Sequence, residues 1–299
     1  MASLSVDFFQ WTLKNPVMVA SGPLSDSARA IKRLLAAGFG AVVTKTIAPR
    51  PSVPVRNAVC SLDGGLLNQE LFSTRSLDSW KEDLPGLDGL PVIVSVTAET
   101  PGELSDLIRA LEKCGGRAFE LVLSCPNGRS QSTPETIGSF ARAARESTDA
   151  PVIAKLSANT NSQFMVELAG AVEESGVDAI SMSDSLPALG IDTQTGRIRL
   201  NGPAGLSGPA IRPLSLKSIY DIKKAGITCP ILGIGGITDF QHVLEYLMVG
   251  ALAVQVFTAL FQRGEGLAQE FTKGLERELA ARGLTLDGIR GCAINQVPT

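Results

Sequence analysis

The chain has 299 residues, of which 44% are hydrophobic and only 5% aromatic, and its formal net charge is −3. This charge, without any Lys/Arg cluster, argues against binding to nucleic acid or to an anionic membrane surface. A single histidine argues against a His-based triad, and five widely spaced cysteines without a CxxC pair indicate free thiols, so we expect no metal site.

Eight short apolar runs alternate with amphipathic stretches, a pattern typical of parallel strands buried on both faces. The predicted strands are 16–20, 41–45, 91–96, 118–123, 151–156, 178–182, 230–234 and 251–256. The predicted helices are 25–37, 102–114, 133–147, 162–175, 213–225, 239–249 and 265–281. This alternation predicts an α/β fold, a single (β/α)8 TIM barrel, with one domain over residues 1–299.

None of these runs reaches the roughly 18 apolar residues of a membrane-spanning helix. The first residues lack the basic start and apolar core of a signal peptide, so we expect a cytoplasmic protein. Two connections, 46–90 after the second strand and 183–212 after the sixth, are long for a barrel. Both leave the carboxyl end of a strand, where barrel active sites lie, and long loops there usually bind ligands.

Glycines follow the seventh strand at Gly235 and Gly236, and Thr258 follows the eighth. The loops after these two strands commonly bind phosphate in such barrels, because glycines let backbone N–H groups approach the anion. Ordinary turn glycines are the alternative interpretation. His242, on the next helix, is interpreted as a surface or packing residue.

Three side chains at strand ends are candidates for chemistry. Lys45 and Lys155 close the second and fifth strands, and a buried ammonium needs an anionic or carbonyl partner. Cys125 directly follows the fourth strand, where a catalytic group belongs. The alternatives are lysines that snorkel or form salt bridges, and a cysteine that only packs.

These segments resemble a known family. The strings Ser124-Cys125-Pro126-Asn127 and Gly205-Leu206-Ser207-Gly208-Pro209-Ala210 carry the resemblance most specifically, with Thr44-Lys45-Thr46 and Gly233-Ile234-Gly235-Gly236-Ile237 in the expected order. Over nearly its whole length the chain resembles class 1 dihydroorotate dehydrogenases and the pyrimidine domain of dihydropyrimidine dehydrogenases.

The resemblance implies an FMN-dependent oxidoreductase that interconverts CH–CH and C=C in a small cyclic substrate. Cys125 would act as general base, or as general acid in the reverse direction, while the neighbouring carbon exchanges hydride with flavin N5. Phe257 stands where the family usually has glycine. The residues implied to contact FMN are Ala20, Ser21, Lys45, Thr46, Asn127, Lys155, Ser183, Gly208, Gly235, Gly236, Phe257 and Thr258.

The implied substrate contacts depart from the family pattern at two positions. Val122 and Asp184 replace asparagines that usually meet the pyrimidine, and a carboxylate accepts hydrogen bonds but cannot donate them. We therefore expect a nitrogen heterocycle or cyclic amide that need not be dihydroorotate. The expected substrate contacts are Lys45, Asn68, Glu70, Leu71, Asn127, Asp184 and Ser185, whereas Arg129 is interpreted as a solvent-facing loop residue.

Three alternatives stay open: dihydroorotate dehydrogenase proper, a flavin-free aldolase that uses Lys45 or Lys155 as a Schiff base, and a non-catalytic binding barrel. The chain carries no dinucleotide-binding GxGxxG fingerprint. Electrons would therefore pass to a small oxidant or to a separate flavin/iron–sulfur subunit, and Ile191-Asp192 with Thr195-Gly196 resembles members that have such a subunit. The resemblance also implies a homodimer.

Overall fold

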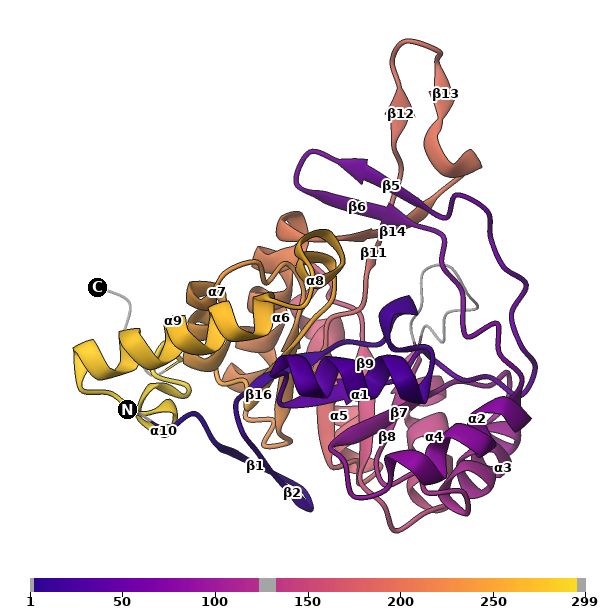
Figure 1. The fold of residues 1–299 in the computed structure, drawn as a ribbon, viewed down its shortest axis with the longest axis horizontal. Coiled ribbons are helices and arrows are strands. Elements are labelled where there is room, and N and C mark those ends of the chain that lie inside the picture. The colour runs from indigo at the N-terminus through magenta and orange to yellow at the C-terminus, as the bar shows by residue number, and fades with distance from the viewer. Residues whose placement is uncertain (1–2, 124–132, 295–299) are drawn as a thin grey trace.

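The computed structural model describes residues 3–123 and 133–294, and a closed parallel barrel lies at its centre (Figure 1). The barrel runs in the order β10-β15-β16-β3-β4-β7-β8-β9. Each strand falls within one of the eight predicted apolar runs, so the predicted (β/α)8 fold is confirmed. The strands are β3 (Val17–Val19), β4 (Ala41–Val43), β7 (Val92–Val96), β8 (Phe119–Val122), β9 (Val152–Leu156), β10 (Ala179–Met182), β15 (Ile231–Ile234) and β16 (Ala253–Val256).

Helices surround the barrel, and each predicted helix is present with shifted ends. The first begins at Ala28 rather than at residue 25, because the Ser27 side chain caps it by accepting from Ala30 N. No helix within residues 3–123 and 133–294 is both long enough and apolar enough to cross a membrane. The helices are α1 (Ala28–Ala37), α3 (Pro101–Glu112), α4 (Pro134–Arg145), α5 (Ser162–Glu174), α6 (Arg212–Lys224), α7 (Phe240–Met248) and α9 (Leu267–Arg282).

A hairpin that the apolar pattern does not predict closes the amino end of the barrel. It consists of β1 (Val6–Phe8) and β2 (Trp11–Leu13), paired antiparallel. Phe8 and Leu13 pack against interior side chains of the strands, including Met18, Ile93 and Leu232. This end of the barrel is therefore filled by apolar groups, which leaves the opposite end for a ligand.

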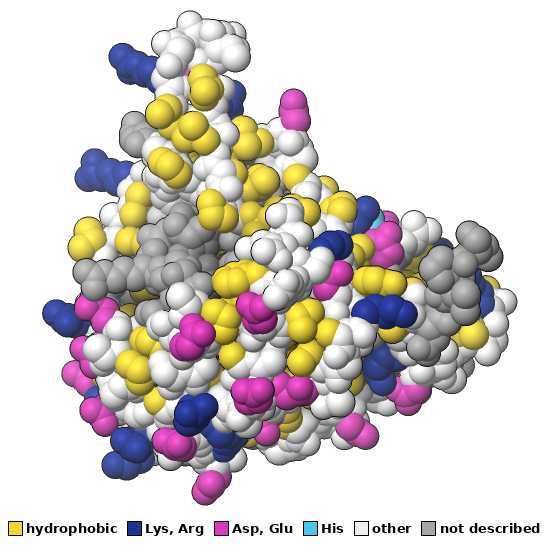
Figure 2. Space-filling view, turned by 180° about the vertical axis from the view of Figure 1, so that it is seen from behind, with side chains coloured by type: hydrophobic (Ala, Val, Ile, Leu, Met, Phe, Trp, Pro, Cys, Tyr) yellow, Lys and Arg dark blue, Asp and Glu magenta, His cyan; other side chains and the backbone are white. Residues whose placement is uncertain are grey.

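The two long connections meet in a second, antiparallel sheet in the order β11-β14-β6-β5. Its strands are β5 (Val59–Leu62), β6 (Gly65–Asn68), β11 (Leu186–Ala188) and β14 (Ala204–Ser207). Beyond it projects a hairpin of β12 (Ile191–Asp192) and β13 (Arg197–Ile198) (Figure 1). Hydrophobic side chains gather on this projecting region, where Leu189, Ile191 and Ile198 are exposed (Figure 2).

Three short helices complete the α-helices of the described residues: α2 (Leu77–Asp83) in the first long connection, α8 (Thr258–Arg263) directly after β16, and α10 (Leu286–Ile289) near the carboxyl terminus. Four 3-10 helices lie at Pro23–Ser25, Leu84–Leu87, Arg199–Asn201 and Pro209–Ile211. Trp80 of α2 is fully buried, and its indole N–H donates to Ser73 Oγ at 3.0 Å. This contact fixes the path by which the first long connection returns to the barrel after it has crossed the carboxyl face.

Candidate functional site

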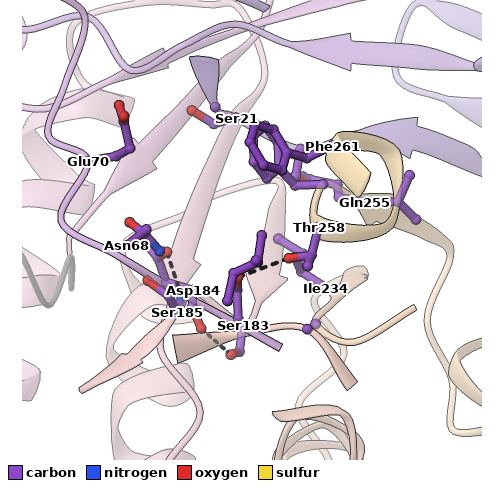
Figure 3. Close-up of a pocket in the computed structure, with 18 of the residues that line it drawn as sticks. Ser21, Asn68, Glu70, Ser183, Asp184, Ser185, Ile234, Gln255, Thr258 and Phe261 are labelled. Atoms are coloured by element: carbon purple, nitrogen blue, oxygen red, sulfur yellow. Dashed lines mark hydrogen bonds between the residues drawn. The ribbon is translucent and has the colours of Figure 1, made fainter. Parts of the chain in front are cut away.

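A pocket opens at the carboxyl ends of the barrel strands, between the barrel and the second sheet (Figure 3). It encloses about 1160 Å³ when its open mouth and the adjoining solvent are included. Strand-end residues from β3, β4, β8, β9, β10, β15 and β16 contribute to its wall. Its position matches the active-site face of TIM barrels.

Nearly all the residues predicted to bind cofactor or substrate come together in this pocket. The lining includes Ala20, Ser21, Lys45, Thr46, Asn68, Glu70, Leu71, Lys155, Ser183, Asp184, Ser185, Gly208, Gly235, Gly236, Phe257 and Thr258. Cys125 and Asn127, like Arg129, lie outside the described residues. Val122, the last residue of β8, also lines the pocket and leads into that segment.

Each of the two predicted lysines has a carboxylate partner. Lys45 Nζ lies 3.3 Å from Glu70 Oε2, and Lys155 Nζ lies 3.6 Å from Asp184 Oδ1. The lysine side chains are 8% and 7% exposed, respectively. These pairs supply the anionic partners that a buried ammonium requires, and they place two acidic groups in the wall of the pocket.

The Asp184 carboxylate has two contacts, both through one of its oxygens. Its Oδ1 accepts a hydrogen bond from Ser185 N at 2.7 Å in addition to the contact with Lys155. Asn68 is fixed from the second sheet, since its Nδ2 donates to Gly205 O at 3.0 Å. Asn68, Asp184 and Ser185 lie together on one side of the pocket, away from Phe261 (Figure 3).

The predicted phosphate loop has the backbone geometry that requires glycine. Gly235 and Gly236 have φ values of +117° and +67°. A Cβ at Gly236 would stand 2.7 Å from Arg212 Cβ and 2.8 Å from Gly208 O, so the two glycine segments approach each other closely. The next helix, α7, is capped by the Asp239 side chain, which accepts from Gln241 N. The first turn of α7 therefore already has a carboxylate as acceptor.

His242 of α7 lies behind this loop and has a structural environment. Its Nδ1 accepts from Thr238 N at 3.2 Å, and its Nε2 lies 2.5 Å from Arg212 Nη1. Burial and the neighbouring Arg212 charge lower the pKa of His242 below its ordinary value of 6.5. The interpretation of His242 as a packing residue agrees with this environment.

Two aromatic rings that the sequence analysis did not combine flank the pocket mouth. Phe257 and Phe261 stack with ring centroids 6.1 Å apart and an interplanar angle of 19°. The Phe257 ring would be 2.2 Å from a Cβ at Gly22, so Gly22 is required for this ring position. Phe261 is 45% exposed at the rim. The pair could have been predicted from the sequence, because residues four apart lie on the same face of a helix.

A polar layer lies inside the barrel beneath the pocket. Glu120 Oε2 accepts from Ser181 Oγ at 2.6 Å and from Gln255 Nε2 at 2.7 Å, and all three residues are fully buried. Gln255 also lines the pocket, and its Oε1 has no hydrogen-bond partner among the described residues. Gln255 is not among the site residues predicted from the sequence, although an amide is unusual within the otherwise apolar strand 253–256.

Comparisons with known proteins agree with the sequence motifs. A family model described as dihydroorotate dehydrogenase matches residues 3–279. The catalytic subunit of dihydroorotate dehydrogenase B (NAD(+)) from Methanothermobacter thermautotrophicus is 34% identical over 283 residues, which cover 91% of this chain and 92% of that protein. The proteins of the same name from Pyrococcus furiosus and Geotalea uraniireducens are 34% and 35% identical, with coverage of at least 94% of each chain.

Proposed function

The chain belongs to the dihydroorotate dehydrogenase family and is a dehydrogenase that acts on a CH–CH bond, and we propose that its substrate is a small cyclic amide and its cofactor FMN. The observation that carries this proposal is the pocket at the carboxyl ends of the strands, because two buried lysines and the glycine segments line it together. We further propose that the whole chain forms one FMN-binding domain.

The wall of the pocket fits a flavin nucleotide. Gly208, Gly235 and Gly236 line the pocket without side chains, which would allow a phosphate to approach their backbone N–H groups. The unpartnered Gln255 Oε1 provides a buried acceptor for a ligand N–H group. Lys155 would stabilise negative charge on the ring, and Ser21, Thr46, Ser183 and Thr258 offer further hydrogen bonds. FMN, when bound, supplies a two-electron acceptor for hydride transfer.

The protein's own contribution would be binding, orientation and one proton transfer. Asn68 and Ser185 would bind ring amide groups, because an asparagine side chain both donates and accepts. Cys125, as general base, would take the proton from the carbon beside the substrate carbonyl, or return it in the reductive direction. Leu71 and Val122 would exclude water from that position.

Electron transfer away from the site would need another protein. The three relatives are named as catalytic subunits of an enzyme whose name includes NAD(+), and this chain carries no GxGxxG fingerprint. We therefore propose a separate electron-transfer subunit together with a homodimeric core. The exposed Leu189, Ile191 and Ile198 of the projecting region are the kind of apolar surface that forms such interfaces.

Dihydroorotate dehydrogenase proper is the second candidate, and the names of the relatives favour it. One experiment tests the proposal and separates the two. The purified protein is examined for flavin absorbance and released FMN, then mixed anaerobically with dihydrouracil, dihydrothymine or dihydroorotate while flavin bleaching is followed. We expect a yellow protein that a cyclic amide reduces. A colourless protein that FMN cannot reconstitute would refute the proposal.

A further inference from the structure

Two ion pairs lie in the part of the pocket that the structure describes. Within the described residues, the ionisable side chains Lys45, Glu70, Lys155 and Asp184 line the pocket, where the other lining residues are neutral. Two ammonium groups and two carboxylates sum to a formal charge of zero. Each lysine is in contact with its own carboxylate, at 3.3 Å and 3.6 Å.

The pairs are set deeply enough for their charges to matter. The lysine side chains are at most 8% exposed, and Asp184 is 15% exposed, so solvent screens the Lys155–Asp184 pair only weakly. Glu70, at 35%, lies nearer the mouth. A ligand anion that enters this pocket would meet two carboxylates as well as two lysines, and it would have to displace a carboxylate from a lysine to gain an ion pair.

Asp184 in particular is held as an acceptor. Both of its contacts, from Ser185 N and from Lys155 Nζ, use Oδ1. Its second oxygen, Oδ2, accepts no hydrogen bond from the described residues. A ring N–H group is the complement of that oxygen, because a carboxylate only accepts, whereas a carboxylate on the ring would repel it.

We propose that this pocket selects an electrically neutral ring that donates N–H groups to Asp184 and Glu70, and that it discriminates against the same ring bearing a carboxylate. This inference rests on the proposed function, since it names the substrate class of the same site. It assigns Asp184 as the residue that determines specificity, through its pairing with Lys155. Replacing the carboxylate by an amide would remove the negative charge that repels a carboxylate on the ring.

The test uses uracil and orotate, which share a ring and differ by one carboxylate. Each is titrated into the FMN-loaded protein, and its dissociation constant is taken from the change in flavin absorbance. We expect wild type to bind uracil at least about tenfold more tightly than orotate, because like charges disfavour the anion. Asp184→Asn is expected to tighten orotate binding by about tenfold or more while uracil changes by less than about threefold.

Two further variants make the result specific. Glu70→Gln removes the other carboxylate and should shift the ratio in the same direction, which covers the case of a misfolded Asp184→Asn protein. Asp106→Asn, on the exposed face of α3, removes one negative charge far from the pocket and should leave the ratio unchanged. Three outcomes would each overturn the inference. Wild type binds orotate as tightly as uracil, neither pocket variant changes the ratio of the two dissociation constants, or neither ring binds. The proposed function would fail separately, through absent flavin or absent reduction by every cyclic amide.

Discussion

Glu120 and Gln255 join opposite walls of the barrel by a hydrogen bond of 2.7 Å between Glu120 Oε2 and Gln255 Nε2. Their strands, β8 and β16, are four places apart in the closed order, so no backbone ladder links them. Ser181 on β10 donates to the same oxygen. A fully buried carboxylate thus ties three strands together directly below the pocket.

Glu120→Ala should destabilise the protein by about 2–5 kcal/mol, because it creates a cavity, removes the acceptor of the buried Ser181 hydroxyl and removes one of the two acceptors of Gln255 Nε2. Urea unfolding of the variant and of wild type measures the difference. Glu174→Ala, at an exposed position of α5, is the control and should change the free energy of unfolding by less than about 0.5 kcal/mol. Equal losses in both variants would contradict a structural role for the Glu120 contacts.

The barrel could be predicted from the sequence because its strands are largely apolar runs buried on both faces, as in Val17–Val19, and all but the second predicted strand are followed by a predicted helix. The second sheet could not. Its strands are three or four residues long, and β6 pairs with β14 across more than 130 residues, so neither period nor spacing marks the pairing.

The same limit applies to the site. The positions of Lys45 and Lys155 in the site could be predicted from the sequence, because both lie at strand ends and the carboxyl ends of barrel strands meet at one face. Their partners Glu70 and Asp184 were not, because both come from irregular segments whose path depends on the second sheet. Sequence alone therefore predicted that the lysines need an anionic or carbonyl partner but left open whether a ligand or the protein provides it.

Gly236→Ala should reduce FMN binding more than it reduces folding. The added Cβ would clash with Arg212 Cβ and Gly208 O, in addition to the strain of a φ of +67°. Gly226→Ala is a matched control, because Gly226 has a φ of +86° but no atom within 4 Å of the added Cβ. Both variants should lose about 1 kcal/mol of stability from backbone strain, and Gly236→Ala should lose more because of its clash. We expect only Gly236→Ala to purify with depleted flavin, and equal flavin content would contradict the phosphate assignment.

Gly22→Ala should disrupt the pocket mouth, because its Cβ would stand 2.2 Å from the Phe257 ring. Removing that ring in a Gly22→Ala/Phe257→Gly double variant should relieve the clash. A double-mutant cycle on the free energy of unfolding should then give a coupling of about 1–3 kcal/mol in favour of the double variant. Additive effects of the two substitutions would show that the Phe257 ring moves aside at no cost.

The stability of the protein should depend on His242 at mildly acidic pH. Its pKa is lowered in the folded state, mainly by burial and then by Arg212, so the unfolded chain binds a proton more readily below pH 6.5. The contribution of neutral His242 is complete above pH 6.5 and is lost as pH falls through the lower folded pKa. Urea midpoints between pH 8 and pH 5 should decline more steeply in wild type than in His242→Gln, and parallel curves would contradict this linkage. The comparison is clean because the chain has one histidine.

Cys125→Ser should separate chemistry from cofactor binding. A serine hydroxyl is a far weaker base than a thiolate, so reduction of the bound flavin by the cyclic amide should slow by about 10²-fold or more. Flavin content should stay at the wild-type level, because the proposed FMN contacts do not include the thiol. Stopped-flow absorbance under anaerobic conditions measures the rate, and Cys292→Ser, at an exposed cysteine, provides the matched control. If Cys125→Ser and Cys292→Ser reduce flavin at the same rate, another group must take the proton.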